Sequence, residues 1–112
     1  KDIHRALKVG GVMTTLMGSF LDRLELSRSY KEAGHIFKHL SVTRVNVPSY
    51  NCGEYCFLIA AKTEDVGAMS LEKLQERVSE RLPDCKLRYY TPEMQLSSHL
   101  MPPYLQATLL DN

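Results

Sequence analysis

The sequence predicts an α/β domain in which helices flank a small sheet, and three segments carry this prediction. Residues 12–17 and 54–62 are runs of apolar residues or threonine with no 3.6-residue period, which is typical of buried strands. Between them, apolar side chains recur at helical spacing from residue 20 to residue 40. The 112 residues suffice for one hydrophobic core, so we treat residues 1–112 as a single unit.

The front of the chain predicts a short helix and then a strand. Asp2 is placed to cap a helix over residues 3–8, and the glycine pair at 10–11 ends it because glycine tolerates the left-handed conformation. The strand over residues 12–17 follows. Since it is apolar or threonine throughout, we expect both of its faces to be covered.

The centre of the chain predicts an amphipathic helix over residues 20–40, which would lie on the sheet. Its apolar stripe consists of Leu26, Tyr30, Ala33, Phe37 and Leu40. From Ser41 onward β-branched residues predict a strand that ends at Pro48.

The segment 54–62 is apolar at both parities, which predicts a central strand covered on both faces. Because only about five residues separate it from the preceding strand, the two must form an antiparallel hairpin. Further on, Ser70 opens a helix that ends at Pro83, and a last short helix is expected over residues 103–110.

Composition excludes several classes of function. The formal charge is +1 and neither sign forms a block, so no basic face for nucleic acid is expected. The longest apolar stretch, 55–61, is far shorter than the roughly 20 residues that cross a bilayer. Cys52, Cys56 and Cys85 are an odd set without CxxC spacing, which favours reduced thiols in a cytoplasmic protein over disulfides or a zinc site.

Motifs for metal binding and nucleophilic catalysis are weak. His35 and His39 have the spacing of one helical turn, but no Glu lies as in HExxH, so we expect solvent-facing side chains and no metal site. His99 and Glu93 are close in sequence, yet no Ser or Cys has the context of a nucleophile. The glycine pair at 10–11 follows a helix and precedes a strand, the reverse of a phosphate-binding loop.

Two segments carry motifs of a known family. Val47-Pro48-Ser49-Tyr50, Gly53 and the strand ending at residues 60–62 are similar to the IPTYxxG hairpin of the spermidine synthases, the polyamine aminopropyltransferase family. The tail, residues 87–92 followed by 100–105 and 107–109, is similar to its terminal segment RYYNPxxHxAAFxLPxYLxxAL. The resemblance covers essentially the whole chain. It implies the C-terminal part of a Rossmann-like, methyltransferase-type sheet that includes an antiparallel terminal hairpin.

The resemblance also implies a reaction. In this family the aminopropyl group of decarboxylated S-adenosylmethionine, the co-substrate of the full domain, is transferred to the small diamine putrescine, which gives spermidine and methylthioadenosine. The glycine-rich nucleotide loop, the acidic residue that holds the ribose and the catalytic Asp all precede residue 1. We therefore assign no catalytic residue here, and expect this portion alone to bind no cofactor and to be inactive. The family implies a homodimer or pairing with a related subunit.

Four residues are implied in substrate binding. Val47, Pro48 and Ser49 correspond to the loop that lines the diamine site, and Leu16 stands where the family usually has a Gln that helps to seat the amine. Leu can neither donate nor accept that hydrogen bond. The strand before the loop has Arg44 and no aromatic residue, and Arg44 would repel a dication if it faced the pocket. We expect the tail to pack rather than to catalyse.

Two alternatives remain open at this point. Leu16 and the missing aromatic residue favour a catalytically silent relative that keeps the fold as a structural or regulatory subunit. A methyltransferase-like protein that uses ordinary S-adenosylmethionine would have the same sheet, since fold does not decide chemistry, but the tail argues against it.

Overall fold

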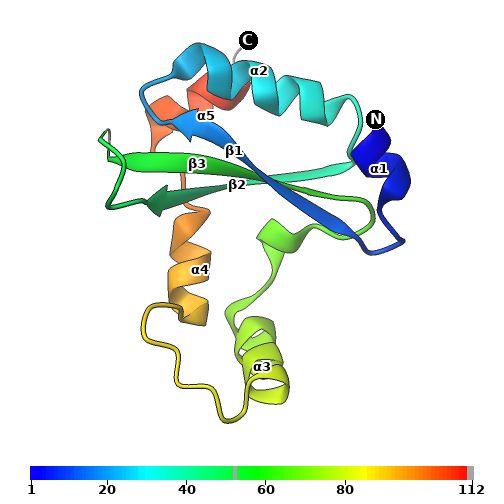
Figure 1. Ribbon diagram of the computed structural model, residues 1–112, viewed down its shortest axis with the longest axis vertical. Coiled ribbons are helices and arrows are strands. Elements are labelled where there is room, and N and C mark those ends of the chain that lie inside the picture. The colour runs from blue at the N-terminus through cyan, green and yellow to red at the C-terminus, as the bar shows by residue number, and fades with distance from the viewer. Residues whose placement is uncertain (52, 111–112) are drawn as a thin grey trace.

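Three strands form one antiparallel sheet with helices on both sides of it (Figure 1). The computed structural model describes residues 1–51 and 53–110. The strands are β1 (Val12–Ser19), β2 (His39–Asn46) and β3 (Glu54–Ala61), in the order β1-β3-β2. Because β3 pairs antiparallel with both neighbours, the predicted central strand and the predicted hairpin are confirmed.

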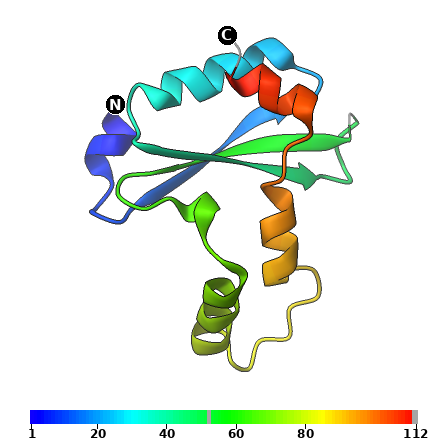
Figure 2. The ribbon, with the colours of Figure 1, turned by 180° about the vertical axis from the view of Figure 1, so that it is seen from behind.

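The helices lie in two groups. Their bounds are α1 (Asp2–Ala6), α2 (Arg23–Gly34), the 3-10 helix η1 (Val66–Ala68), α3 (Leu71–Arg81), α4 (Pro92–Ser98) and α5 (Pro103–Leu110). Figures 1 and 2 place α2 and α5 on one face of the sheet, with α3 and α4 on the opposite side. The predicted α/β class is confirmed. In the part of the chain that the structure describes, no helix is long and apolar enough to cross a membrane.

The hydrophobic core lies between the sheet and the helices α2 and α5. Its four largest fully buried side chains are Leu26, Leu58, Leu105 and Cys56. Burial, with the charge of Glu54 second, raises the pKa of the Cys56 thiol. Cys56 and Cys85 are free thiols, as predicted, and Cys52 lies outside the described residues.

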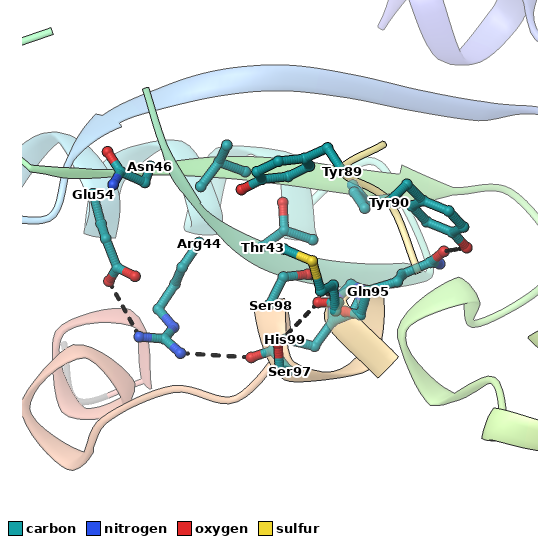
Figure 3. A pocket seen from close by; sticks show the side chains of 13 residues that line it. Thr43, Arg44, Asn46, Glu54, Tyr89, Tyr90, Gln95, Ser97, Ser98 and His99 are labelled. Atoms are coloured by element: carbon teal, nitrogen blue, oxygen red, sulfur yellow. Dashed lines mark hydrogen bonds and ion pairs between the residues drawn. The ribbon is translucent and has the colours of Figure 1, made fainter. Parts of the chain in front are cut away.

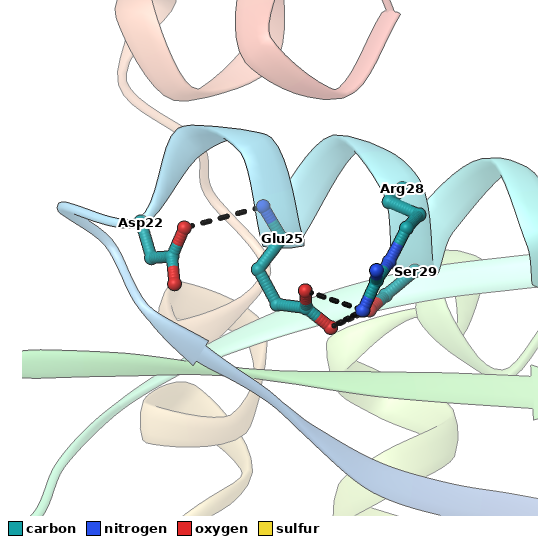
Figure 4. A network of polar contacts seen from close by, with 4 residues as sticks. All are labelled: Asp22, Glu25, Arg28 and Ser29. Carbon is teal, nitrogen blue, oxygen red and sulfur yellow. Dashed lines mark hydrogen bonds and ion pairs between the residues drawn. The ribbon is translucent and has the colours of Figure 1, made fainter.

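Helix α2 begins at Arg23, three residues later than the predicted start at residue 20. The Asp22 carboxylate accepts a hydrogen bond from the backbone N–H of Glu25 at 3.2 Å and so caps the helix (Figure 4). One turn on, the Glu25 carboxylate lies 2.7 Å from the Arg28 guanidinium. Capping by Asp22 therefore fixes where the helix starts.

The same helix ends at Gly34, not at residue 40. His39 and Leu40 belong to β2, where they pair with Ala61 and Ala60. The prediction that His35 and His39 stand on one helical turn is therefore wrong. The apolar spacing continued past the helix because Phe37 is also buried, although it lies in the connection to the strand.

Strand β1 is an edge strand, and the prediction that both of its faces are covered is wrong. Thr14 and Leu16 are exposed on the face away from α2, and Met17 is the one described position of β1 that is buried. A bulge at Gly18 shifts the register after Leu16, and its φ of 137° is one that glycine tolerates. The apolar run identified the strand correctly, but it did not determine whether both faces of the strand are covered.

Helix α1 is shorter than predicted and starts without a side-chain cap. It spans Asp2–Ala6, and Lys1, not Asp2, is its first flanking residue. Asp2 instead pairs with Arg5 at 3.2 Å on the surface. The chain then turns at Gly10, whose φ is 77°, as the glycine pair predicted.

The outer edge of β2 is covered by the last residues of α4 and the segment that joins it to α5, together called the crossover (residues 97–102). Figure 2 shows it passing β2 on its way from one side of the sheet to the other. Two contacts hold it: the Arg44 guanidinium donates to the Ser97 carbonyl at 3.5 Å, and the Ser41 hydroxyl lies 2.7 Å from Nδ1 of His99. Covering an edge in this way protects it from pairing with another strand.

Candidate functional site

A pocket of about 400 Å³ lies between the sheet and the tail, beside α4 (Figure 3). This volume is in the range of small-molecule sites. The residues that line it come from β2, β3 and the tail: Thr43, Arg44, Val45, Asn46, Glu54, Ile59, Tyr89, Tyr90, Met94, Gln95, Ser97, Ser98 and His99.

The floor of the pocket is the sheet face opposite the core. In the register of the hairpin, Thr43 pairs with Phe57 and Val45 pairs with Tyr55. Side chains of a directly paired couple point to the same face, and alternate residues of β3 (Cys56, Leu58 and Ala60) point to the core. The floor therefore presents the β-branched side chains of Thr43, Val45 and Ile59, whereas Arg44, which pairs with Cys56, starts from the opposite face.

The wall of the pocket is held by the start of α4. The Thr91 hydroxyl accepts a hydrogen bond from the Met94 N–H at 3.1 Å, and Pro92 occupies the first turn of the helix. The Tyr90 hydroxyl bonds to the Gln95 side-chain oxygen. These contacts fix the tail so that Tyr89, which is 70% exposed, stands at the rim.

The two charged side chains among the described lining residues neutralise each other. Arg44 Nη1 lies 3.1 Å from the Glu54 carboxylate. Arg44 also reaches the Ser97 carbonyl, so it joins the hairpin to the crossover (Figure 3). The sequence raised the question of whether Arg44 faces the pocket; it lies at the pocket, with its charge already paired.

His99 joins the crossover to β2 at the other end of the pocket. Burial lowers the pKa of His99, an effect that the Val42 backbone and the charge of Asp65 partly oppose. The imidazole is therefore neutral at pH 7 and suited to its 2.7 Å contact with Ser41. Glu93 does not approach it, because its carboxylate accepts from Gln75 at 3.0 Å. No His–carboxylate pair forms between these two residues.

The residues that the sequence implicated in substrate binding lie next to the pocket, not in its lining. Leu16 pairs with Phe57, which pairs with Thr43 on the far side, so all three lie abreast on one sheet face. Leu16 is 46% exposed. Val47, Pro48 and Ser49 follow β2 directly, in a turn closed by the hydrogen bond from the Tyr50 N–H to the Val47 carbonyl at 2.9 Å. Their contact with substrate stays a prediction.

Sequence reasoning missed the tail side of the pocket. Tyr89, Met94, Gln95 and Ser98 were assigned to packing, yet they line the space opposite Val45. What marks this side is the exposure of Tyr89, which the structure shows and the sequence alone does not. Among the described residues, no group of three or more His, Cys, Asp or Glu side chains could hold a metal ion.

The chain is similar to polyamine aminopropyltransferases. It is 31% identical over 106 residues to the polyamine aminopropyltransferase of Pectobacterium carotovorum, a match that covers 94% of this chain and 36% of the relative. It is 32% identical over 108 residues to that of Korarchaeum cryptofilum, which covers 96% of this chain and 33% of the relative. The resemblance to this family that the sequence indicated is confirmed.

The chain spans about a third of the length of these curated relatives. No protein-family model matches it. Among solved structures, the chain is similar in fold to part of spermidine synthase from Thermotoga maritima, with a TM-score of 0.77 at 23% identity over 96% of this chain and 36% of that chain. A spermidine synthase in complex with the transition-state analogue AdoDATO gives a TM-score of 0.78, also at 23% identity, over 96% and 35%. The predicted Rossmann-like, methyltransferase-type class is thereby confirmed.

Proposed function

We propose that this chain is the C-terminal portion of an aminopropyltransferase, which moves an aminopropyl group from decarboxylated S-adenosylmethionine to an amine such as putrescine. The observation that carries the proposal is the similarity to polyamine aminopropyltransferases over 94% of the chain. The shared fold with spermidine synthase supports it. The remaining two thirds of such a protein would supply the nucleotide loop and the catalytic Asp, so this portion alone is inactive.

The reaction is a direct substitution. A neutral amine nitrogen attacks the carbon bonded to the sulfonium, the carbon–sulfur bond breaks, and its electron pair stays on sulfur in methylthioadenosine. The amine nitrogen then loses a proton to a base outside these residues. The part of this chain is positioning: Leu16 and the turn residues Val47, Pro48 and Ser49 line the amine site at the ends of β1 and β2.

The full protein acts in the cytoplasm as a homodimer or with a related subunit. A test of its activity uses the natural protein that contains these 112 residues, with any polypeptide that supplies the nucleotide-binding half. It is given decarboxylated S-adenosylmethionine with putrescine, spermidine or cadaverine, and methylthioadenosine is detected by mass spectrometry. Product with any amine supports the proposal. No product from a folded protein, beside an active relative as control, contradicts it.

One observation favours a second candidate, a catalytically silent subunit. The Glu54 carboxylate beside the pocket is already bound by Arg44, and Leu16 offers no hydrogen bond to an amine. The variant Leu16→Gln separates the two candidates. In an enzyme with altered specificity it raises turnover of putrescine, whereas in a silent subunit it leaves turnover absent.

A further inference from the structure

A second pocket, of about 300 Å³, lies between α3 and the start of the tail, and is here called the arginine pocket. Figures 1 and 2 both show α3 on the same side of the sheet as α4. The volume is at the lower end of the range for small-molecule sites. The residues that line it are Val66, Met69, Leu74, Arg77, Val78, Arg81, Leu82, Tyr90 and Gln95. None of them belongs to the proposed amine site.

Most of the wall of the arginine pocket is apolar. Val66 and Met69 come from η1 and the residue that follows it. Leu74 and Val78 are four residues apart and so share one face of α3. Leu82, directly after the helix, is 42% exposed. Part of this apolar surface therefore faces water, and a ligand with an apolar body would gain free energy by covering it.

Two arginine side chains add positive charge to the same pocket. Arg77 and Arg81 are also four residues apart on α3, and no Asp or Glu is among the described lining residues. Glu80 lies three residues after Arg77 in sequence but forms no ion pair with it. Within residues 1–51 and 53–110, neither guanidinium has an ion pair or a hydrogen bond. Because like charges at this spacing repel each other, a bound anion would relieve that repulsion.

A third hydrogen-bond donor comes from Gln95. Tyr90 and Gln95 line both this pocket and the pocket beside α4 (Figure 3). The Tyr90 hydroxyl bonds to the Gln95 side-chain oxygen and so orients the amide. The amide nitrogen of Gln95 has no partner in the part of the chain that the structure describes. It can donate to an anion, as the two guanidinium groups can.

We propose that the arginine pocket binds an anionic amphiphile, a carboxylate attached to an alkyl or aryl body. Arg77 and Arg81 bind the carboxylate, whose two oxygens match the planar fork of a guanidinium. The apolar body lies against Leu74, Val78 and Leu82. A polyamine is cationic and is repelled by the same arginines, so this site is distinct from the amine site. The inference does not depend on the proposed aminopropyl transfer.

Ligands that share a chain length but differ in head group test the proposal. The probes are octanoate, octan-1-ol and octylamine, with acetate as the head group that lacks the body. With the natural full-length protein at fixed ionic strength, we expect calorimetry to show saturable binding of octanoate, tighter than that of octan-1-ol or octylamine by about tenfold or more. Acetate should bind more weakly than octanoate by about tenfold or more, because it buries no methylene groups.

Three outcomes of this titration would overturn the inference. They are no saturable binding of octanoate, equal binding of octanoate and octan-1-ol, and equal binding of octanoate and acetate. Since no turnover is measured, the result is independent of whether the protein transfers an aminopropyl group.

Matched variants locate the bound carboxylate. Arg77→Gln and Arg81→Gln each remove one charged donor, and each should weaken octanoate binding by about tenfold. The control Arg88→Gln makes the same change of charge in the exposed segment after α3, at a residue that does not line the pocket. Equal weakening by Arg88→Gln would show that net charge decides the affinity. Unchanged affinity in both other variants would show that octanoate binds elsewhere. Either result contradicts the inference.

A charge on the apolar wall tests where the body lies. Leu82→Glu removes an apolar contact and adds a carboxylate, so it should weaken octanoate binding by about tenfold. The control Leu87→Glu adds the same charge at a position of similar exposure, 43% against 42%, outside the pocket. Both positions are exposed, so the fold should be kept, and unfolding midpoints check this. Equal effects of the two variants on octanoate binding would overturn the inference.

Discussion

The face of the sheet that α2 and α5 cover is closed, whereas the face beside α4 is half open. Along the single strand β3, Cys56, Leu58 and Ala60 are at most 2% exposed, while the alternate residues Tyr55 and Phe57 are half-buried. The closed face carries the tightly packed core, and the half-open face carries the pocket. Because successive side chains of a strand point to opposite faces, alternate residues of β3 contribute to the core on one face and to the face with the pocket on the other.

The largest expected effect is on the closed face. Leu105 of α5 is 1% exposed and belongs to the core, so Leu105→Ala should lower the free energy of unfolding by about 2–5 kcal/mol. The control Leu110→Ala, at a position 60% exposed on the same helix, should change it by no more than about 0.5 kcal/mol. Urea unfolding of the 112-residue chain measures both. Similar losses of unfolding free energy for the two variants would mean that Leu105 is no better packed against the sheet than the exposed Leu110.

On the half-open face, we expect a loss of stability where two segments pack closely, at Gly67 and Ser41. A Cβ on Gly67 would lie 2.3 Å from the Ser41 hydroxyl oxygen, so Gly67→Ala should cost about 1–3 kcal/mol through overpacking. The matched control is Gly34→Ala in α2, where the nearest atom lies at 3.5 Å. Because alanine favours the helix, that variant should be neutral or stabilising by up to about 1 kcal/mol. If both variants lowered the unfolding midpoint equally, the close contact between Gly67 and Ser41 would be contradicted.

A smaller effect is expected from the ion pair at the pocket. Arg44 and Glu54 are both partly exposed, so a double-mutant cycle of Arg44→Met and Glu54→Gln should give a coupling free energy of about 0.2–1 kcal/mol. The coupling should weaken as salt is added. A value above about 2 kcal/mol, insensitive to salt, would show that this face is as closed as the other.

The smallest effect concerns the pH dependence of the crossover. Because burial lowers the pKa of His99, the unfolded chain takes up a proton more readily than the folded one as the pH falls below about 6.5. Stability contributed by the neutral ring is therefore complete above that pH and is lost in acid. His99→Gln should reduce the fall in unfolding free energy between pH 8 and pH 5.5. An unchanged fall would place His99 in contact with water.

The sequence could predict the elements whose pattern alone defines them. The hairpin followed from the short separation of two apolar runs, and α5 begins and ends at the predicted residues because Pro103 and the apolar run mark it. The start of α3 was likewise predicted from Ser70, which caps the helix. Its hydroxyl accepts a hydrogen bond from the Lys73 N–H.

The wrong predictions for α2 and β1 and the missed pocket share one physical cause. The spacing of apolar residues does not show which other part of the chain buries them. Phe37 is buried without being helical, so the periodicity overran α2. Leu16 is apolar without being covered, so β1 was assigned two covered faces. The pocket escaped prediction because Val45 and Met94, almost fifty residues apart, meet only in the folded chain.

The position of α5 has a consequence for synthesis on the ribosome, where a chain is made from its N-terminus. Leu105 and Leu109 complete the core under α2, and they are made after every strand of the sheet. Until then Leu26 and Leu58 lack these two partners, and α2 is the helix that covers this face of the sheet. During synthesis this core therefore stays open until α5 has emerged, in a state that a holdase chaperone would bind.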